Sequence, residues 1–378
     1  MTASEETCDL QPEFQLKDSI KGKFGFVMEQ QVGMKTYYQN WRRGVENIGG
    51  VDATWVPINY YRQHGMSEKM KFIPGSLRAI ISCLSEIREG LGNDRYDALL
   101  FNTFNPALID RRTARKQPNY IVFDVTPIQY DRMSEWYGHK VGKNTLVNRY
   151  KHERVKETLQ NANGLFAWSS WAGNSAIEDY GVPPERMHIL PPGVDTTLWH
   201  PLPAEKRPAD GTVRILFTGF DFERKGGELL LKWATSTSKK NWEIHIATRE
   251  MQEVPTGVFV HTGLKSNSNE LVELAQKSDI FVLPTRADCF SLVSLEAMAV
   301  GMPVLTTTVG GISEIVRENE TGFLVPPDDY DSFHDRLDRL VEDGELRVKM
   351  GQRGREVVCS KFNAFKNVYK GLKIMAGS

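Results

Sequence analysis

Residues 281–327 alternate short apolar runs with helix-like segments, and this alternation constrains the fold more than any other feature of the chain. FVLPT at 281–285 has the composition of a buried strand, and PVLTTTV at 303–309 is a second. Between them, SLVSLEAMAV at 291–300 has the length of a buried helix, and GGISEIV from 310 predicts another helix behind a glycine turn. Strands separated by helices predict an α/β protein with a parallel sheet.

The same alternation occurs on both sides of a segment rich in proline and polar residues, TTLWHPLPAEKRPADG, at 196–211. We interpret this segment as a linker. The prediction is therefore two Rossmann-like, doubly wound parallel-sheet domains, one at 1–195 and one at 212–350, followed by helical sequence at 351–378.

Two carboxylates flank the start of the expected helix at 291–300. Glu296 has apolar neighbours nearly all round, so its burial requires a partner. That partner is either an internal amide or arginine, or a polar ligand such as a ribose hydroxyl pair at the strand ends. Asp288 lies in the preceding loop, beside the helix N-terminus, where the amides of Phe290, Ser291 and Leu292 favour an anion. A sugar diphosphate suits this pattern.

A second anion site is predicted in GFDFERKGGELLLK, at 219–232. The expected strand ends at Gly219, and Arg224 and Lys225 stand just before a glycine pair that opens a helix. Cations beside a helix N-terminus can bind a phosphate without a metal ion. The alternative is two solvated charges on a loop. In combination with the acidic pair, we favour phosphate binding.

Asp288, Glu296 and the sequence that follows them, LEAMAVGMPVLTTTVGGISEIVRENETGFLVPPDD, resemble family 4 of the retaining nucleotide-sugar glycosyltransferases. The likeness is close over about residues 160–345 and looser before them. It implies the two-domain GT-B fold, with a terminal helix that returns to the first domain. It also implies a retaining, metal-independent transfer in which the leaving phosphate takes the proton of the incoming hydroxyl.

The resemblance also suggests roles for residues. Asp288 occupies the first acidic position of the family signature, and Arg224 and Lys225 are expected to share the diphosphate, because Phe220 stands where the family usually has arginine. The donor is expected to be a nucleoside diphosphate sugar of UDP or GDP type. The acceptor is a hydroxyl of a polysaccharide, glycolipid or small molecule.

The acceptor side is expected in the first domain. Gly33, at a strand-to-helix turn, resembles the family's glycine loop, reduced here to one glycine. Asp124 ends an expected strand and either assists the acceptor or caps the turn at Thr126. His139 is the histidine nearest to the position where many members of the family carry one; the alternative is a structural histidine.

Neither a metal site nor a cofactor is expected. Asp329 and Asp331 precede an amphipathic helix and fit an N-cap with a first-turn acid. The eight histidines form no i, i+4 pair on a helix, and the four cysteines show no C-x-x-C spacing. Scattered cysteines favour a reducing setting without disulfides.

Charge and hydropathy restrict the partners. The net charge of −1 gives no general attraction to nucleic acid. No apolar run approaches the length of a membrane span, and the acidic N-terminus is unlike a signal peptide, so a cytoplasmic protein is expected. SEKMKFIPGSLRAIISCL at 67–84 mixes basic and apolar residues, and it fits either peripheral contact with an anionic membrane or a core helix with solvated lysines.

Two further functions fit the same expected architecture. A nucleotide-sugar epimerase or hydrolase would need no acceptor, so its products would distinguish it from a transferase. A two-lobed binding protein would show no turnover. No feature of the sequence specifies an oligomeric state.

Overall fold

The computed structural model describes residues 20–31, 33–60, 74–138, 145–249 and 253–377. The chain divides into two compact units, which we describe one by one. The N-terminal unit contains the described residues up to Pro192 together with those from Ala364 onward, and the C-terminal unit is Gly193–Asn363. The segment at 196–211, expected to be a linker, belongs to the C-terminal unit. The boundary expected after residue 350 falls inside a continuous helix, α13 (Gly344–Lys361).

The N-terminal unit is built on a six-stranded sheet in the order β2-β1-β3-β4-β5-β6, with every neighbouring pair parallel. Its strands are β1 (Gly22–Glu29), β2 (Val51–Ile58), β3 (Ala98–Asn102), β4 (Asn119–Phe123), β5 (Gly164–Ala167) and β6 (Met187–Ile189). The strand order reverses between β1 and β3, because β2 lies outside β1 and all later strands lie beyond β3. This reversal is the switch point at which open α/β sheets leave a crevice for ligands.

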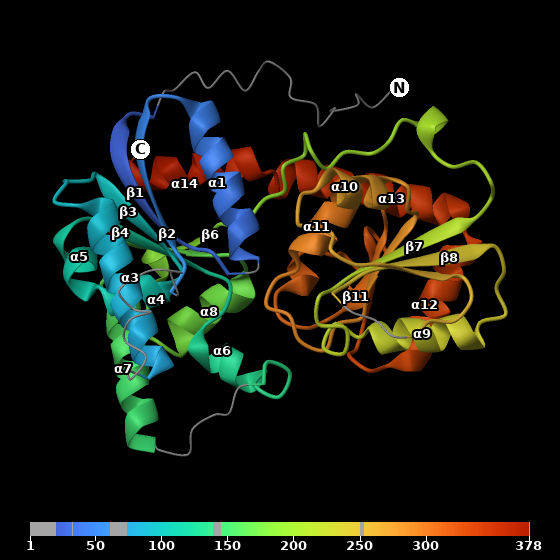
Figure 1. Ribbon diagram of the computed structural model, residues 1–378, viewed down its shortest axis with the longest axis horizontal. Coiled ribbons are helices and arrows are strands. Elements are labelled where there is room, and N and C mark those ends of the chain that lie inside the picture. Colours follow the sequence, from blue (N-terminus) through green and yellow to red (C-terminus); the bar gives the residue numbers. More distant parts are fainter. Residues whose placement is uncertain (1–19, 32, 61–73, 139–144, 250–252, 378) are drawn as a thin grey trace. The chain divides into compact units, whose positions relative to one another are not determined.

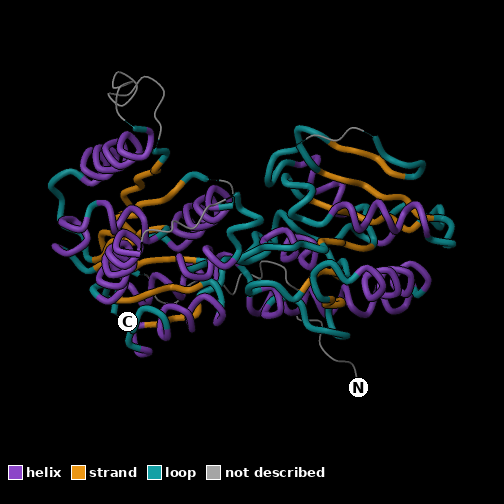
Figure 2. The backbone as a smooth tube through the Cα atoms, turned by 90° about the horizontal axis from the view of Figure 1, so that it is seen from below, coloured by secondary structure: helices purple, strands orange, loops and turns teal. Residues whose placement is uncertain are grey.

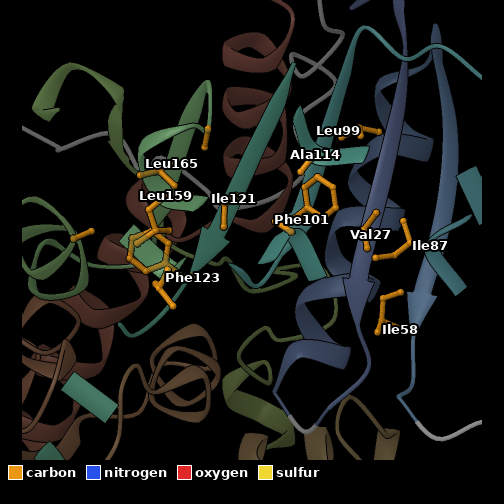
Figure 3. Close-up of a cluster of buried hydrophobic side chains, with 14 of the residues drawn as sticks. Val27, Ile58, Ile87, Leu99, Phe101, Ala114, Ile121, Phe123, Leu159 and Leu165 are labelled. Carbon is orange, nitrogen blue, oxygen red and sulfur yellow. The ribbon is translucent and has the colours of Figure 1, made fainter. Parts of the chain in front are cut away.

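Helices cover both faces of this sheet (Figures 1 and 2). They are α1 (Met34–Ile48), α3 (Gly75–Leu91), α4 (Phe104–Ile109), α5 (Arg111–Lys116), α6 (Pro127–Arg132), α7 (Thr145–Gln160), α8 (Ser170–Glu178) and α14 (Ala364–Met375). Figure 3 shows part of the core on one face, where Val27, Phe101 and Ile121 of the strands meet side chains such as Ile87 of α3. Alternate strand residues therefore face this core, as a two-sided sheet requires.

On the other face of the N-terminal sheet, α14 packs against α1. A Cβ on Gly44 of α1 would lie 2.9 Å from Val368, and one on Gly371 of α14 would lie 2.8 Å from the Trp41 ring. The Tyr120 hydroxyl donates a hydrogen bond of 3.1 Å to the Ile374 carbonyl. Small residues thus let the C-terminal helix approach closely, and the last helix of the chain belongs to the N-terminal unit.

The C-terminal unit has a second six-stranded parallel sheet, in the order β12-β11-β10-β7-β8-β9. Its strands are β7 (Val213–Thr218), β8 (Trp242–Ala247), β9 (Val258–His261), β10 (Ile280–Leu283), β11 (Val304–Thr307) and β12 (Gly322–Val325). The order reverses between β7 and β10, which places the switch point there. The expected doubly wound α/β class is therefore confirmed in both units.

In the C-terminal unit, α9 (Gly227–Ser236) and α12 (Tyr330–Glu342) cover one face, and α10 (Asn269–Gln276), α11 (Leu292–Ala299) and α13 cover the other (Figure 1). The helix expected after Gly310 is wrong: only a 3-10 turn, Ile312–Glu314, forms there. The short strand β12 was missed, because a run of four residues, GFLV, carries little periodicity.

The cysteines differ in part from the expectation. Cys83 and Cys289 are free and buried. Cys359 in α13 is disulfide-bonded, contrary to the prediction of four reduced cysteines. The scattered spacing of the cysteines could not reveal this bond. Among the described residues, no helix is both long and apolar enough to span a bilayer.

Candidate active site

The loops that follow β7 and β10 meet at the switch point of the C-terminal sheet. Gly226, the N-cap of α9, has φ 74°, and a Cβ there would lie 1.9 Å from the Pro284 carbonyl oxygen. The amide of Arg286 donates a hydrogen bond of 2.9 Å to the Arg224 carbonyl. Only glycine permits this approach, because a side chain would be both strained and in collision. The two loops are therefore held as one structure.

We expect Gly226→Ala to destabilise the protein by roughly 2–4 kcal/mol, since a left-handed alanine is strained and the loops must also separate. Gly263→Ala is the matched control, because Gly263 has φ 78° in the same unit and nothing within 4 Å of its Cβ position. Denaturant unfolding of both variants measures the difference. Equal losses would show that the close approach to Pro284 contributes nothing.

Lys225 and Asp288 form an ion pair across these loops. The Lys225 amine lies 2.5 Å from the Asp288 carboxylate, and their side chains are only 14% and 13% exposed. Gly219 makes room for the lysine, because a Cβ at Gly219 would lie 3.0 Å from the Lys225 side chain. A charge pair largely removed from water keeps a fixed orientation, and its field is screened less than that of a surface pair.

Arg224 points to different partners. Its Nε lies 3.0 Å from an Asp221 carboxylate oxygen, and its Nη1 donates a hydrogen bond of 2.8 Å to the Ala287 carbonyl. Arg224 therefore braces the β7 loop against the β10 loop. Arg286, which sequence reasoning missed, has a similar role: it pairs with Asp328 at 2.7 Å and with Glu228 at 3.4 Å.

The N-terminus of α11 completes this edge of the sheet. Ser291 is its N-cap and accepts a hydrogen bond of 3.3 Å from the Ser294 amide. The amides of Ser291, Leu292 and Val293 are then the first-turn donors that have no acceptor within the helix. The sequence prediction placed these donors one residue too early. Phe290 precedes the cap, and its ring packs against Phe362. A helix start cannot be located to the residue from its apolar pattern.

Glu296 lies in the second turn of α11 and is 7% exposed. Burial raises the pKa of its carboxyl to about 8. Within the described part of the chain no hydrogen bond or ion pair to this carboxylate is present, and desolvation is the cause of its shift. Of the two alternatives, the internal partner is therefore not found in that part of the chain. A buried carboxylate in this state gains from any ligand that donates hydrogen bonds.

Gly310, in the loop after β11, also contributes to the site. It has φ 57°, and a Cβ there would lie 2.1 Å from the Asp288 carbonyl oxygen. The Gly311 amide donates a hydrogen bond of 2.9 Å to the Cys289 carbonyl. Sequence reasoning interpreted these glycines as a helix start. Their function in the structure is to let a third strand end support the backbone around Asp288.

The other predicted residues lie in the N-terminal unit, and we describe them separately. Gly33 caps α1 with φ 87°, and no atom lies within 4 Å of its Cβ position. Asp124 follows β4 and is half-buried. The Thr126 amide donates to Gln129 Oε1 at 3.2 Å, and both alternatives for Asp124, acceptor contact and turn cap, stay predictions. His139 falls outside the described residues.

Asp329 and Asp331 lie at the N-terminus of α12, as the sequence predicts. Asp329 is the N-cap of α12 and accepts from the Ser332 amide at 3.1 Å, and Asp331 lies in the first turn. Over the described ranges, no group of three His, Cys, Asp or Glu side chains is arranged to hold a metal ion.

Two doubly wound units, one with a buried lysine and a helix N-terminus at its switch point, are typical of a class of nucleotide-binding α/β proteins. Residues 202–357 match the family model of the Glycosyl transferases group 1, and residues 50–198 match that of Glycosyltransferase Family 4. The chain belongs to the group 1 glycosyltransferases of the GT-B type.

Two curated relatives that align over most of the chain are 26–28% identical to it over the aligned residues. The MMP alpha-(1->4)-mannosyltransferase of Mycolicibacterium hassiacum is 28% identical over 253 residues, which are 63% of this chain and 60% of the relative. The D-inositol 3-phosphate glycosyltransferase of Pseudarthrobacter chlorophenolicus is 26% identical over 321 residues, 74% of this chain and 70% of the relative. The match thus spans well under the full length of these relatives.

Solved structures agree with the fold over nearly the whole chain. Sucrose-phosphate synthase from Thermosynechococcus elongatus has a TM-score of 0.74 at 16% identity and covers 95% of this chain and 100% of its own. Anabaena HepE in complex with UDP-glucose has a TM-score of 0.67 at 13% identity, with 94% and 100% covered. At these identities, the likeness concerns the fold alone.

Proposed function

We propose that this glycosyltransferase is a retaining enzyme that transfers a hexose from a nucleoside diphosphate sugar to a hydroxyl acceptor without a metal ion. The observation that carries the proposal is the Lys225–Asp288 pair beside the first-turn amides of α11, at the switch point of the C-terminal sheet. UDP and UDP-glucose complexes of a protein with this fold support a nucleotide-sugar donor.

The leaving group sets the chemical requirement. When the bond from the sugar to the diphosphate breaks, negative charge develops on the leaving phosphate. A fixed ammonium and oriented amides can stabilise such a charge without reorganising, because their positions are set before the reaction. In our proposal, Lys225 binds the diphosphate directly and the amides of Ser291, Leu292 and Val293 assist. Arg224 keeps the loop in position through Asp221 and Ala287.

Glu296 serves the nucleoside part of the donor in this proposal. A ribose offers two adjacent hydroxyl donors, and a buried carboxylate without a partner in the described chain is suited to accept both. Ligand hydrogen bonds to the charged form would lower the pKa of Glu296 again. Retention of configuration and transfer of the acceptor proton to the leaving phosphate follow from the family resemblance and are part of the proposal.

A thermal-shift screen against UDP, GDP, ADP, CDP and their common sugars, with and without EDTA, tests this function. We expect one nucleotide family to raise the Tm and EDTA to leave that shift unchanged, since binding to the folded state alone stabilises it. NMR of the product made from the α-linked donor then reports the anomer. A shift that EDTA abolishes contradicts metal independence, and no shift with any nucleotide contradicts the donor site.

A further inference from the structure

Exposed apolar side chains are concentrated in the first turns of two helices of the N-terminal unit. Nine large apolar side chains of the described chain are exposed, and five of them lie at 75–82 in α3 or at 145–152 in α7. These five are Leu77, Ile80, Leu146, Val147 and Tyr150. Leu146 is 78% and Tyr150 is 64% exposed. Scattered apolar residues on a surface need no explanation, but a group of them indicates a partner.

The two groups lie at the same edge of the N-terminal sheet. Each helix ends a few residues before a strand begins, β3 after α3 and β5 after α7, so both helices start at the carboxyl edge of the parallel sheet. Helix α4 packs against both of them, and Ile87 of α3 and Val155 of α7 belong to one core. The two groups therefore belong to one layer of helices, at the edge where open α/β sheets bind ligands.

The first turns of both helices extend beyond that core. The first buried side chain is Ser82 in α3 and Val155 in α7. At 1.5 Å per residue, about 10 Å of α3 and about 15 Å of α7 precede the core. In Figure 1 the start of α7, drawn in green, projects past the sheet. Packing within the unit therefore does not account for the apolar residues of these turns.

Cations accompany these apolar side chains. Arg78 lies at 75–82, Arg149 and Lys151 lie at 145–152, and neither stretch contains an Asp or Glu. The helix dipole favours acids at an N-terminus, yet the first turns of α3 and α7 contain none. Positive charge at this end of both helices adds to the dipole, so this surface attracts an anionic partner.

The arrangement on α7 specifies the kind of partner further. At 3.6 residues per turn, Leu146, Val147 and Tyr150 lie within a sector of about 100°. Arg149 and Lys151 lie on either side of that sector, and both are exposed. An apolar stripe with basic borders is typical of a helix at a bilayer surface, where the apolar side chains enter the acyl boundary and the cations contact anionic headgroups.

We propose that the first turns of α3 and α7 bind the protein peripherally to an anionic lipid bilayer. A second copy of the chain fits this surface less well, because its cations would face cations. The sequence left membrane contact and a core helix as alternatives for 67–84, and the described part combines both features: Cys83 is buried, whereas Leu77 is 47% exposed. The inference goes beyond the proposed function, since it requires neither a donor nor turnover.

Flotation of the full-length protein with lipid vesicles tests this inference. One set of vesicles is phosphatidylcholine alone, and the other is an equal mixture of phosphatidylcholine and phosphatidylglycerol. We expect binding to the mixed vesicles only. The bound fraction should fall between about 0.1 M and about 1 M salt, because the Debye length shrinks from about 10 Å to about 3 Å.

Two double variants separate the charged from the apolar contribution. Arg149→Gln/Lys151→Gln should weaken binding to the mixed vesicles by about five- to thirtyfold, as expected for the loss of two cations at an anionic surface. Leu146→Ser/Tyr150→Ser keeps every charge and should weaken binding by about tenfold or more, because less apolar area enters the bilayer. All four side chains are exposed, so we expect the Tm of each variant to stay near that of the wild type.

Matched controls come from the C-terminal unit. Lys277→Gln/Lys349→Gln removes two exposed cations, and Val348→Ser removes an apolar side chain that is 58% exposed. Both should leave vesicle binding unchanged. A loss equal to that of the α7 variants would mean that general charge or hydropathy causes the binding, and the proposal would be wrong.

Other results also overturn the proposal. They are no binding to the mixed vesicles at low salt, equal binding to phosphatidylcholine alone, or α7 variants that bind as the wild type does. If the protein forms a dimer without lipid and Leu146→Ser/Tyr150→Ser dissociates it, the surface is an interface between copies instead. None of these measurements contains a nucleotide, so their failure leaves the proposed donor site standing, and a failed nucleotide screen leaves the bilayer contact standing.

Discussion

Replacing Lys225 by methionine should lower kcat by roughly a hundred- to a thousandfold, with a smaller change in the KM of the donor. In the proposed reaction, the charge of Lys225 acts mainly on the leaving diphosphate in the transition state. Methionine keeps most of the volume and removes the ammonium. The measurement is initial-rate kinetics with the donor identified by thermal shift. Turnover close to that of the wild-type protein would rule out this role for Lys225.

Stability must be separated from catalysis, because Lys225→Met leaves the Asp288 carboxylate without its ion-pair partner. An unpaired, largely buried charge is strongly destabilising. The double variant Lys225→Met/Asp288→Asn removes both charges, so we expect it to recover much of the stability and none of the turnover. Lys277→Met is the matched control, since that lysine is 52% exposed and pairs with Glu273 on the surface.

Glu296→Gln should stabilise the unliganded protein at high pH and leave it nearly unchanged at low pH. Burial raises the pKa of Glu296 from its ordinary 4.5 to about 8, so the folded protein binds this proton more tightly than the unfolded chain does. The stability that this proton contributes is therefore fully present below about pH 4.5 and is lost as the pH rises through about 8. The upper limit of this loss is roughly 5 kcal/mol, at about 1.4 kcal/mol per pKa unit.

Denaturant unfolding of wild type and Glu296→Gln at about pH 5 and about pH 9 measures this linkage. The same variant should weaken nucleotide binding, because a glutamine replaces the charged acceptor of the ribose hydroxyls. Glu345→Gln, at an exposed position of α13, is the control. A stability difference that does not depend on pH would show that Glu296 does not carry the raised pKa.

Much of the fold could be predicted from local sequence. Alternating apolar runs placed most of the strands, and apolar neighbours on every side of Glu296 indicated its burial. The prediction failed where the local signal is short: GFLV at β12 was missed, and GGISEIV forms only a 3-10 turn. The start of α11 was placed early, because the pattern of apolar residues does not reveal which serine caps the helix.

In the candidate site, too, local sequence predicted part of the arrangement and packing decided the rest. Arg224 and Lys225 are consecutive and chemically alike, and the sequence could only assign them a common role. Packing separates them, since the Arg224 guanidinium contacts the Ala287 carbonyl and the Lys225 amine contacts Asp288.

The sequence by itself determined the α/β class, the burial of Glu296 and the residue types at the strand ends, because these depend on neighbours along the chain. Tertiary structure alone decided that β7 lies beside β10, so that Lys225 meets Asp288, and that the loops come close enough to require Gly226 and Gly310. Strand order and close backbone approach are set by packing between segments far apart in the chain. No local pattern encodes such packing.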